Sequence, residues 1–221
     1  MDKELNLLLP LIDDAQAPEK VNDYEFHAGR IGRHGVVVMK CGIGKVNAAV
    51  GTLTLIDNFH PDCVINTGVA GGADPSMRVL DLLVTTGVAY HDVWCGPGTE
   101  YGAANGFDVV MRPWQKIIDI ARTAPEVGDR AKYGLICSGD KFISTAEEVA
   151  DIKSHFPETL AVDMESAAIA QVCVMKCVPF NILRVVSDTP GQEENISQYA
   201  NFWTDAPRET FMALCAILKA L

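Results

Sequence analysis

The chain has 221 residues, of which 48% are hydrophobic and 21% charged, and its formal net charge is −11 at pH 7. This balance is typical of a globular protein with one substantial core, and it excludes a disordered chain. The acidic charge, without a basic cluster in the sequence, argues against nucleic acid or an anionic membrane as a partner. A small nucleoside carries little charge and is not excluded.

The cysteines and the N-terminal residues bear on the cellular compartment. The seven cysteines are scattered and lie inside apolar runs, which is typical of thiols in a reducing compartment. No apolar run approaches the roughly 18 residues needed to span a bilayer. The N-terminal segment 1–4 lacks the layout of a signal peptide. We therefore expect a cytoplasmic protein. The cysteines have no histidine-rich partner cluster, so we expect no metal site, and no cofactor is expected either.

Strand and helix patterns alternate along the chain. Short apolar runs predict strands at 36–39, 63–66, 79–85, 133–137 and 180–186, with a further short strand just before Glu165. Helical spacing predicts helices at 46–56, 113–123, 145–155, 165–176 and 204–221, with Ser144 or Thr145 as the N-cap of the third. The glycine-rich stretch 90–108 is predicted to be a long loop at an active site or interface. Residues 1–221 are thus expected to form a single α/β domain with a central mixed β-sheet flanked by helices.

Two carboxylates follow predicted strands. Asp188 comes after the strand at 180–186 and Ser187, and it precedes a turn; ligands of α/β proteins bind at this edge of the sheet. Glu165 lies where a short strand gives way to an Ala-rich helix, whose dipole favours acidic groups. Two carboxylates at one sheet edge indicate acid–base chemistry or binding of sugar hydroxyls. The alternative is that Glu165 is only a helix-terminal charge and Asp188 only a turn former.

Two glycine-rich segments and one aromatic residue also point to a binding site. Residues 42–45 lack the spacing of a nucleotide-phosphate loop, so we interpret them as a tight turn that brings the backbone close to a ligand. Residues 67–72 would let backbone N–H groups approach a ligand, or would form a simple crossover turn. Phe142 follows a strand and could stack on a flat heterocycle, or be ordinary core. The residues of the two glycine-rich segments assigned to the site are Ile43, Val69 and Gly71.

Several segments together resemble a known family. In chain order they are Cys-Gly-Ile-Gly-Lys-Val-Asn-Ala-Ala (41–49), Ile-Asn-Thr-Gly-Val-Ala-Gly-Gly (65–72), Ser-Gly-Asp-Lys-Phe-Ile (138–143), Val-Asp-Met-Glu-Ser-Ala-Ala-Ile-Ala (162–170) and Arg-Val-Val-Ser-Asp (184–188). The combination resembles the nucleoside phosphorylase/hydrolase superfamily, and more closely its 5′-methylthioadenosine/S-adenosylhomocysteine nucleosidase branch. The resemblance covers nearly the whole chain.

The resemblance implies hydrolysis of methylthioadenosine and S-adenosylhomocysteine by a homodimer. Asp188 would be the general acid that protonates adenine N7, and Glu4, in a Met-x-x-Glu segment, would be the base that activates water. Inverting glycosidases divide the same two tasks between two carboxyl groups. The implied binding roles are these: Glu165 holds the ribose hydroxyls, Met164 packs on the sugar, Phe142 stacks on adenine, Ile143 bonds the edge of adenine through its backbone, Arg184 lies near the water and Glu165, and Ser187 orients Asp188.

The sequence also departs from the family pattern. A strand normally precedes the Met-x-x-Glu segment, and here Met1 falls where that segment begins. Either the recorded start lies too far downstream, or the first strand is missing, which would leave Glu4 on a poorly anchored terminus. Val69 stands where the nucleosidases often have Ser, and the loop at 94–99 lacks the aromatic pair that commonly closes the pocket of the 5′-substituent. The choice of 5′-group therefore stays open.

Three other activities stay open. One is a sister nucleosidase that acts on futalosine or another 6-substituted purine nucleoside. Another is a phosphorylase, although the sequence has no N-terminal Gly-Asp-Pro-x-Arg loop to hold a phosphate dianion. The third is a catalytically silent nucleoside-binding protein, which the presence of both Asp188 and Glu165 disfavours.

Overall fold

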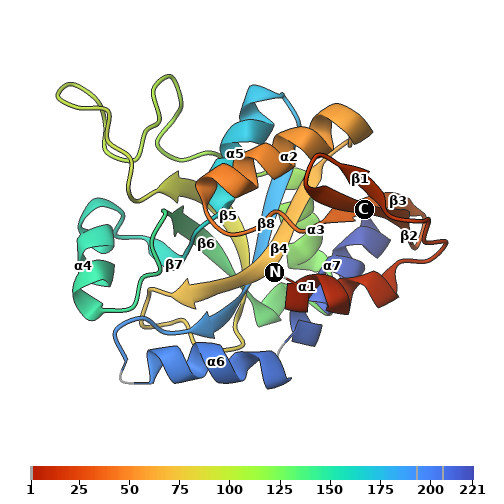
Figure 1. Cartoon of the computed structure of the whole chain (residues 1–221). Helices are drawn as coiled ribbons and strands as arrows, with labels where there is room; N and C mark the ends of the chain where they lie inside the picture. Colours follow the sequence, from red (N-terminus) through yellow and green to blue (C-terminus); the bar gives the residue numbers. More distant parts are fainter. Residues whose placement is uncertain (1, 193, 206) are drawn as a thin grey trace.

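A closed β-barrel forms the centre of the computed structural model, which describes residues 2–192, 194–205 and 207–221 (Figure 1). The strand order is β4-β7-β6-β5-β8. The pairs β4–β8, β5–β6 and β6–β7 are parallel, whereas β5–β8 and β4–β7 are antiparallel. The predicted α/β fold with a central mixed sheet is confirmed. The strands are β4 (Val64–Gly72), β5 (Leu82–Tyr90), β6 (Ala131–Ser138), β7 (Thr159–Asp163) and β8 (Phe180–Asp188).

Helices and a small second sheet surround the barrel. The antiparallel sheet comprises β1 (Glu19–Val21), β2 (Tyr24–Ile31) and β3 (His34–Met39). The helices are α1 (Asp2–Leu8), α2 (Lys45–Phe59), α3 (Gln115–Thr123), α4 (Ala146–His155), α5 (Ser166–Met175), α6 (Asn195–Asp205) and α7 (Pro207–Ala220). Figure 1 shows α2 beside α5 on one side of the barrel, and the long β5–α3 connection projecting from the body. None of the helices within the described ranges is long and apolar enough to cross a membrane.

Local sequence accounts for the elements that frame the site. Every residue of β8 is buried, as expected for an apolar central strand covered on both faces. Helix α4 begins with a capping box, in which Thr145 accepts a hydrogen bond from the Glu148 backbone and the Glu148 carboxylate accepts one from the Thr145 backbone. The predicted N-cap at Thr145 is therefore confirmed. The Ala-rich face of α5 packs closely on the barrel because its alanines have no bulk.

Several predicted boundaries are wrong. Residues 67–72 do not form a loop but continue β4, because they pair with β8 and, at their end, with β7. Strand β5 pairs with β6 from Leu82 to Tyr90. The strand predicted at 79–85 was therefore placed too early. The predicted helix at 204–221 corresponds to α7, preceded by the unpredicted α6, and residue 206 lies outside the described residues.

The described chain begins with helix α1 rather than with a strand. This helix carries Glu4 and buries Leu8 in the core cluster that also contains Ile31 and Ile217. Glu4 therefore lies on a helix that is packed against the body of the protein. This packing gives its carboxyl group a defined position toward the barrel.

Candidate active site

A cavity of about 170 Å³ lies beside the ends of β4, β7 and β8, at the edge of the barrel where the sequence predicted a site. It is closed further by the 41–43 turn, the 141–143 loop, α1 and α6. The structure places every sequence-predicted site residue in its lining. These residues are Glu4, Ile43, Val69, Gly71, Phe142, Ile143, Met164, Glu165, Arg184, Ser187 and Asp188.

Asp188 stands at the last position of β8 with only 2% of its surface exposed. Ser187 Oγ donates to Asp188 Oδ1 at 2.6 Å. The side-chain amide of Asn195, oriented by its hydrogen-bonding partners, donates to Asp188 Oδ2 at 2.6 Å and to the Thr189 carbonyl at 3.3 Å. Burial raises the pKa of Asp188, and the Ser187 hydrogen bond offsets part of that rise. The carboxyl group is thus held at both oxygens and retains a proton more readily than an exposed aspartate.

An aromatic pair stands over one side of the cavity. Phe142 is 45% exposed, so the alternative that it is ordinary core is wrong. Its ring lies edge-on to Tyr199 of α6, with centroids 5.5 Å apart. Ile143, the next residue in the loop, is buried, and it lines the cavity as well. A flat ring in the cavity would find an aromatic face on Phe142 and backbone groups beside Ile143.

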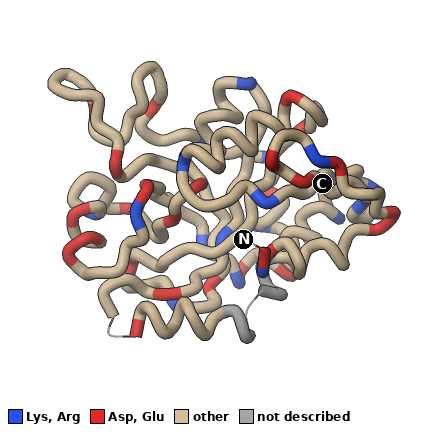
Figure 2. Tube along the Cα trace, in the orientation of Figure 1, with Lys and Arg blue, Asp and Glu red and all other residues tan. Residues whose placement is uncertain are grey.

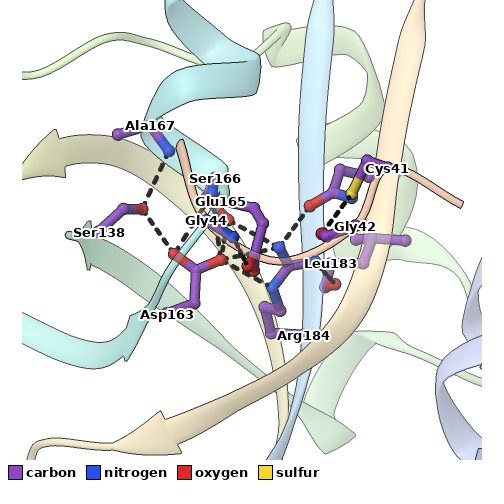
Figure 3. Close-up of polar contacts among 11 residues, drawn as sticks. Cys41, Gly42, Gly44, Ser138, Asp163, Glu165, Ser166, Ala167, Leu183 and Arg184 are labelled. Carbon is purple, nitrogen blue, oxygen red and sulfur yellow. Dashed lines mark hydrogen bonds and ion pairs between the residues drawn. The ribbon is translucent and has the colours of Figure 1, made fainter. Parts of the chain in front are cut away.

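Glu165 faces the cavity rather than capping its own helix. It occupies the N-cap position of α5, yet its side chain makes no capping hydrogen bond there. Instead, Glu165 Oε1 accepts a hydrogen bond from the Gly44 backbone at 2.9 Å (Figure 3). Burial, and then the nearby Asp163 carboxylate, raise the pKa of Glu165. The alternative of a simple helix-terminal charge is therefore wrong. The 42–45 turn brings a backbone N–H group, that of Gly44, into contact with Glu165.

A buried ion pair lies beneath Glu165. Arg184 donates to Asp163 Oδ2 from Nε at 3.1 Å and from Nη2 at 2.7 Å (Figure 3). Its Nη2 also donates to Asn66. Asp163 further accepts 2.5 Å hydrogen bonds from the hydroxyls of Ser138 and Ser166. Burial opposes the charge on Arg184, but the surrounding carboxylates outweigh it and raise its pKa.

The wall formed by β4 approaches Glu4 closely. A Cβ atom at Gly68 would lie 2.9 Å from Glu4 Oε1 and 3.2 Å from Arg184 Nη1. Cys41 also lines this end, where burial raises the pKa of its thiol to about 11, so it stays protonated near neutral pH. Glu4 and Arg184 are thereby brought to one end of the cavity.

Several residues of the site were not predicted from the sequence. Asp163 was visible in the Val162–Ser166 segment, two residues before Glu165, but its partner Arg184 is 21 positions away. Tyr199 and Asn195 lie on α6, which was not predicted, and nothing local marks them. The other lining residues not predicted are Cys41, Gly42, Asn66, Thr67, Gly68, Ala70, Lys141 and Val162.

The cavity lining is acidic. Its carboxylates are Glu4, Asp163, Glu165 and Asp188, while its cations Arg184 and Lys141 form ion pairs with Asp163 and Glu148. Figure 2 shows Lys and Arg dispersed over the described chain rather than gathered on one face. Within the described residues, no group of three or more His, Cys, Asp or Glu could hold a metal ion.

Comparison with known proteins gives the class first. Residues 1–219 match the family model described as "Phosphorylase superfamily", and the chain belongs to that superfamily. A protein named 5′-methylthioadenosine/S-adenosylhomocysteine nucleosidase from Exiguobacterium sp. is 41% identical over 226 residues, covering 100% of this chain and 95% of the relative. The protein of that name from Geobacillus thermodenitrificans is 46% identical over 176 residues, covering 78% of this chain and 75% of the relative.

Solved structures agree with this assignment. The 5′-methylthioadenosine/S-adenosylhomocysteine nucleosidase of S. pneumoniae, determined with the transition-state inhibitor MT-ImmA, has a TM-score of 0.94 at 34% identity, covering 100% of this chain and 96% of that one. Within the superfamily, the chain is thus a member of the 5′-methylthioadenosine/S-adenosylhomocysteine nucleosidases, which are N-glycosyl hydrolases.

Proposed function

We propose that the protein hydrolyses the N-glycosidic bond of 5′-methylthioadenosine and S-adenosylhomocysteine and releases adenine. The observation that carries the proposal is Asp188, a buried carboxyl group with a raised pKa in a cavity that Glu4 also lines. Cleavage of a ribosyl C–N bond needs a proton for the leaving base and a water for C1′. A general acid and a general base in one cavity meet both needs.

At the base end, Asp188 gives its proton to adenine N7 as the C–N bond breaks. The electron pair of that bond stays on the base, which leaves as neutral adenine. Ser187 and Asn195 hold the two carboxyl oxygens and fix the direction of transfer. Phe142 stacks on the base, and the backbone at Ile143 bonds its edge. The raised pKa of Asp188 supports this role, because an acid must carry its proton near neutral pH.

At the sugar end, the carboxylate of Glu165 accepts hydrogen bonds from the ribose hydroxyls while the Gly44 N–H fixes its orientation. Met164 packs on the ribose. Glu4 takes a proton from the water whose oxygen attacks C1′. Arg184 supports the Glu165 carboxylate electrostatically, because its buried positive charge opposes the rise in the pKa of Glu165.

The charge of the cavity favours water over phosphate as the nucleophile. Both cations in the described lining are engaged by carboxylates, and the acidic groups outnumber them. A phosphate dianion would therefore enter an acidic cavity without an unengaged arginine to hold it. This observation supports a hydrolase rather than a phosphorylase.

We also propose that two copies of the chain associate. Helix α2 carries an exposed apolar stripe, in which Val46 is 73% exposed and Val50 and Leu53 follow at helical spacing. The stripe continues into Ile43 at the rim of the cavity. Exposed apolar stripes of this kind bury themselves at interfaces, and a twofold pair is the commonest arrangement.

The test is incubation of the purified protein with methylthioadenosine, with and without phosphate, while free adenine is measured by chromatography. We expect phosphate-independent release, and the Asp188→Asn variant should lose about 10²–10⁴-fold in rate because its amide cannot supply the proton. Strict dependence on phosphate would overturn the hydrolase. If methylthioadenosine is not cleaved, and the purine base is released only from futalosine or another 6-substituted purine nucleoside, the protein is a sister nucleosidase. Adenine binding without any turnover would leave a silent binding protein.

A further inference from the structure

A cluster of three charged residues lies beside the cavity, and none of the three belongs to its lining. The mechanism above does not use this cluster. Lys45 Nζ donates to Asp92 Oδ1 at 2.9 Å and Oδ2 at 2.8 Å, and lies 3.9 Å from Asp140 Oδ2. The three residues come from different parts of the chain: Lys45 begins α2, Asp92 follows β5, and Asp140 follows β6. We name them the Lys45 clamp.

The backbone takes part in the clamp as well. Asp140 Oδ1 accepts a hydrogen bond from the Lys45 backbone N–H at 2.7 Å, and Asp92 Oδ2 accepts one from the Asp140 N–H at 2.9 Å. The N-cap residue of α2 is Gly44, with φ of +89°, and it has no side chain to cap the helix. Asp140 supplies that cap from another loop, where its charge also complements the helix dipole.

The segments that the clamp joins carry two walls of the cavity. Ile43 and Gly44 directly precede Lys45, and Phe142 follows Asp140 by two residues. Gly44 also donates the backbone hydrogen bond that orients Glu165. Any shift of the Gly44–Lys45 peptide therefore moves the partner of Glu165 and the Ile43 wall together. A shift of the loop at 139–142 moves the aromatic wall.

From this geometry we infer that Lys45, Asp92 and Asp140 are positioning residues, which set the spacing of the Ile43 and Phe142 walls and hold Gly44 against Glu165. The inference extends the function proposed above and rests on it for the substrate. Loss of the lysine leaves the carboxylates of Asp92 and Asp140 side by side without their cation. Their repulsion then opens the connection between the two walls.

The main variant is Lys45→Met, with Lys45→Arg as the conservative rescue. We expect Lys45→Met to raise KM for methylthioadenosine and to weaken adenine binding in calorimetry by about 5- to 100-fold, since a displacement of about 1 Å can cost about 100-fold. Lys45→Arg should recover most of the loss. The matched control is Lys132→Met, which removes a comparably exposed ion pair with Asp81 at 3.0 Å, away from the cavity, and should stay within twofold.

Amide hydrogen exchange keeps the test independent of turnover. The Gly44 and Lys45 amides, which bond Glu165 and Asp140, should exchange faster in Lys45→Met than in the parent. If the parent neither releases nor binds adenine, the proposed function fails while exchange still decides the clamp. If Lys45→Met does not fold, Asp140→Ala against Asp140→Asn serves instead, because Asn still caps the helix and Ala does not. Unchanged KM, adenine binding and exchange in the variant would overturn the inference.

Discussion

Replacement of Asp163 by Asn tests whether the buried ion pair beneath the cavity supports the fold. Asp163 and Arg184 are both nearly inaccessible, with side chains 2% and 3% exposed. The substitution keeps the shape of the side chain and removes its charge. It leaves the Arg184 guanidinium without the carboxylate that its Nε and Nη2 both contact.

The expected loss follows from the burial of the pair. Removal of one partner of a buried ion pair costs about 3–5 kcal/mol, because the remaining charge stays desolvated. The entropy of unfolding is about 2.1 cal/mol/K per residue, or roughly 0.46 kcal/mol/K for the chain of 221 residues. Asp163→Asn should therefore lower Tm by about 6–11 °C.

Thermal unfolding followed by circular dichroism measures this shift. Asp57→Asn is the control, since Asp57 forms an ion pair with Lys176 in which the side chains are 49% and 37% exposed. Such exposed pairs contribute about 1 kcal/mol or less, so the control should lose no more than about 2 °C. If Asp163→Asn lowers Tm by no more than the limit of about 2 °C set for the control, the burial of the ion pair does not stabilise the fold as argued.

Asp188→Asn should stabilise the protein increasingly as pH rises from about 4 toward 7, because the raised pKa means that the folded state holds this proton more tightly than the unfolded state. A difference in Tm from the parent that does not change with pH, in melts across that range, would contradict it. Gly68→Ala should slow adenine release by about tenfold or more, since the new Cβ would lie 2.9 Å from Glu4 Oε1. Gly72→Ala, on the same strand outside the cavity lining, is its control, and equal rates for the two would count against the placement of Glu4. Light scattering should give about twice the 23.9 kDa of one chain, and Val50→Lys on the α2 stripe should reduce it toward one chain; a monomeric parent at micromolar concentration would exclude the association.

The elements near the site that could be predicted are those with strong local signals. The apolar run at 180–186 specifies a central strand, and the polar pair Ser187–Asp188 marks its end. Thr145 and Glu148 define the start of α4 without reference to the rest of the chain. Each of these assignments depends only on residues that are close together in the sequence. The sequence alone is therefore sufficient to predict these elements.

The remaining features depend on contacts between distant segments. Residues 67–72 look like a loop because of their glycines, yet they form a strand, since they pair with the distant strands β7 and β8. Their glycines leave room for neighbours such as Glu4 and Arg184 at Gly68. The cap of α2 comes from Asp140, 95 positions away, which no local pattern could show. The polar and apolar mixture at 24–31 likewise becomes a strand through pairing with β1 and β3.

The glycine-lined wall of β4 has a consequence for how the protein can change over evolutionary time. Along that wall a Cβ at Gly68 or Gly71 would meet a neighbour at 2.9 or 3.0 Å, so new side chains cannot arise there without displacing others. The rim carries Ile43, which is 56% exposed, and this position accepts residues of different size. Selection for a new ligand can therefore act on the rim while the β4 wall stays constant, which leaves the reacting bond in place as the outer group of the ligand varies.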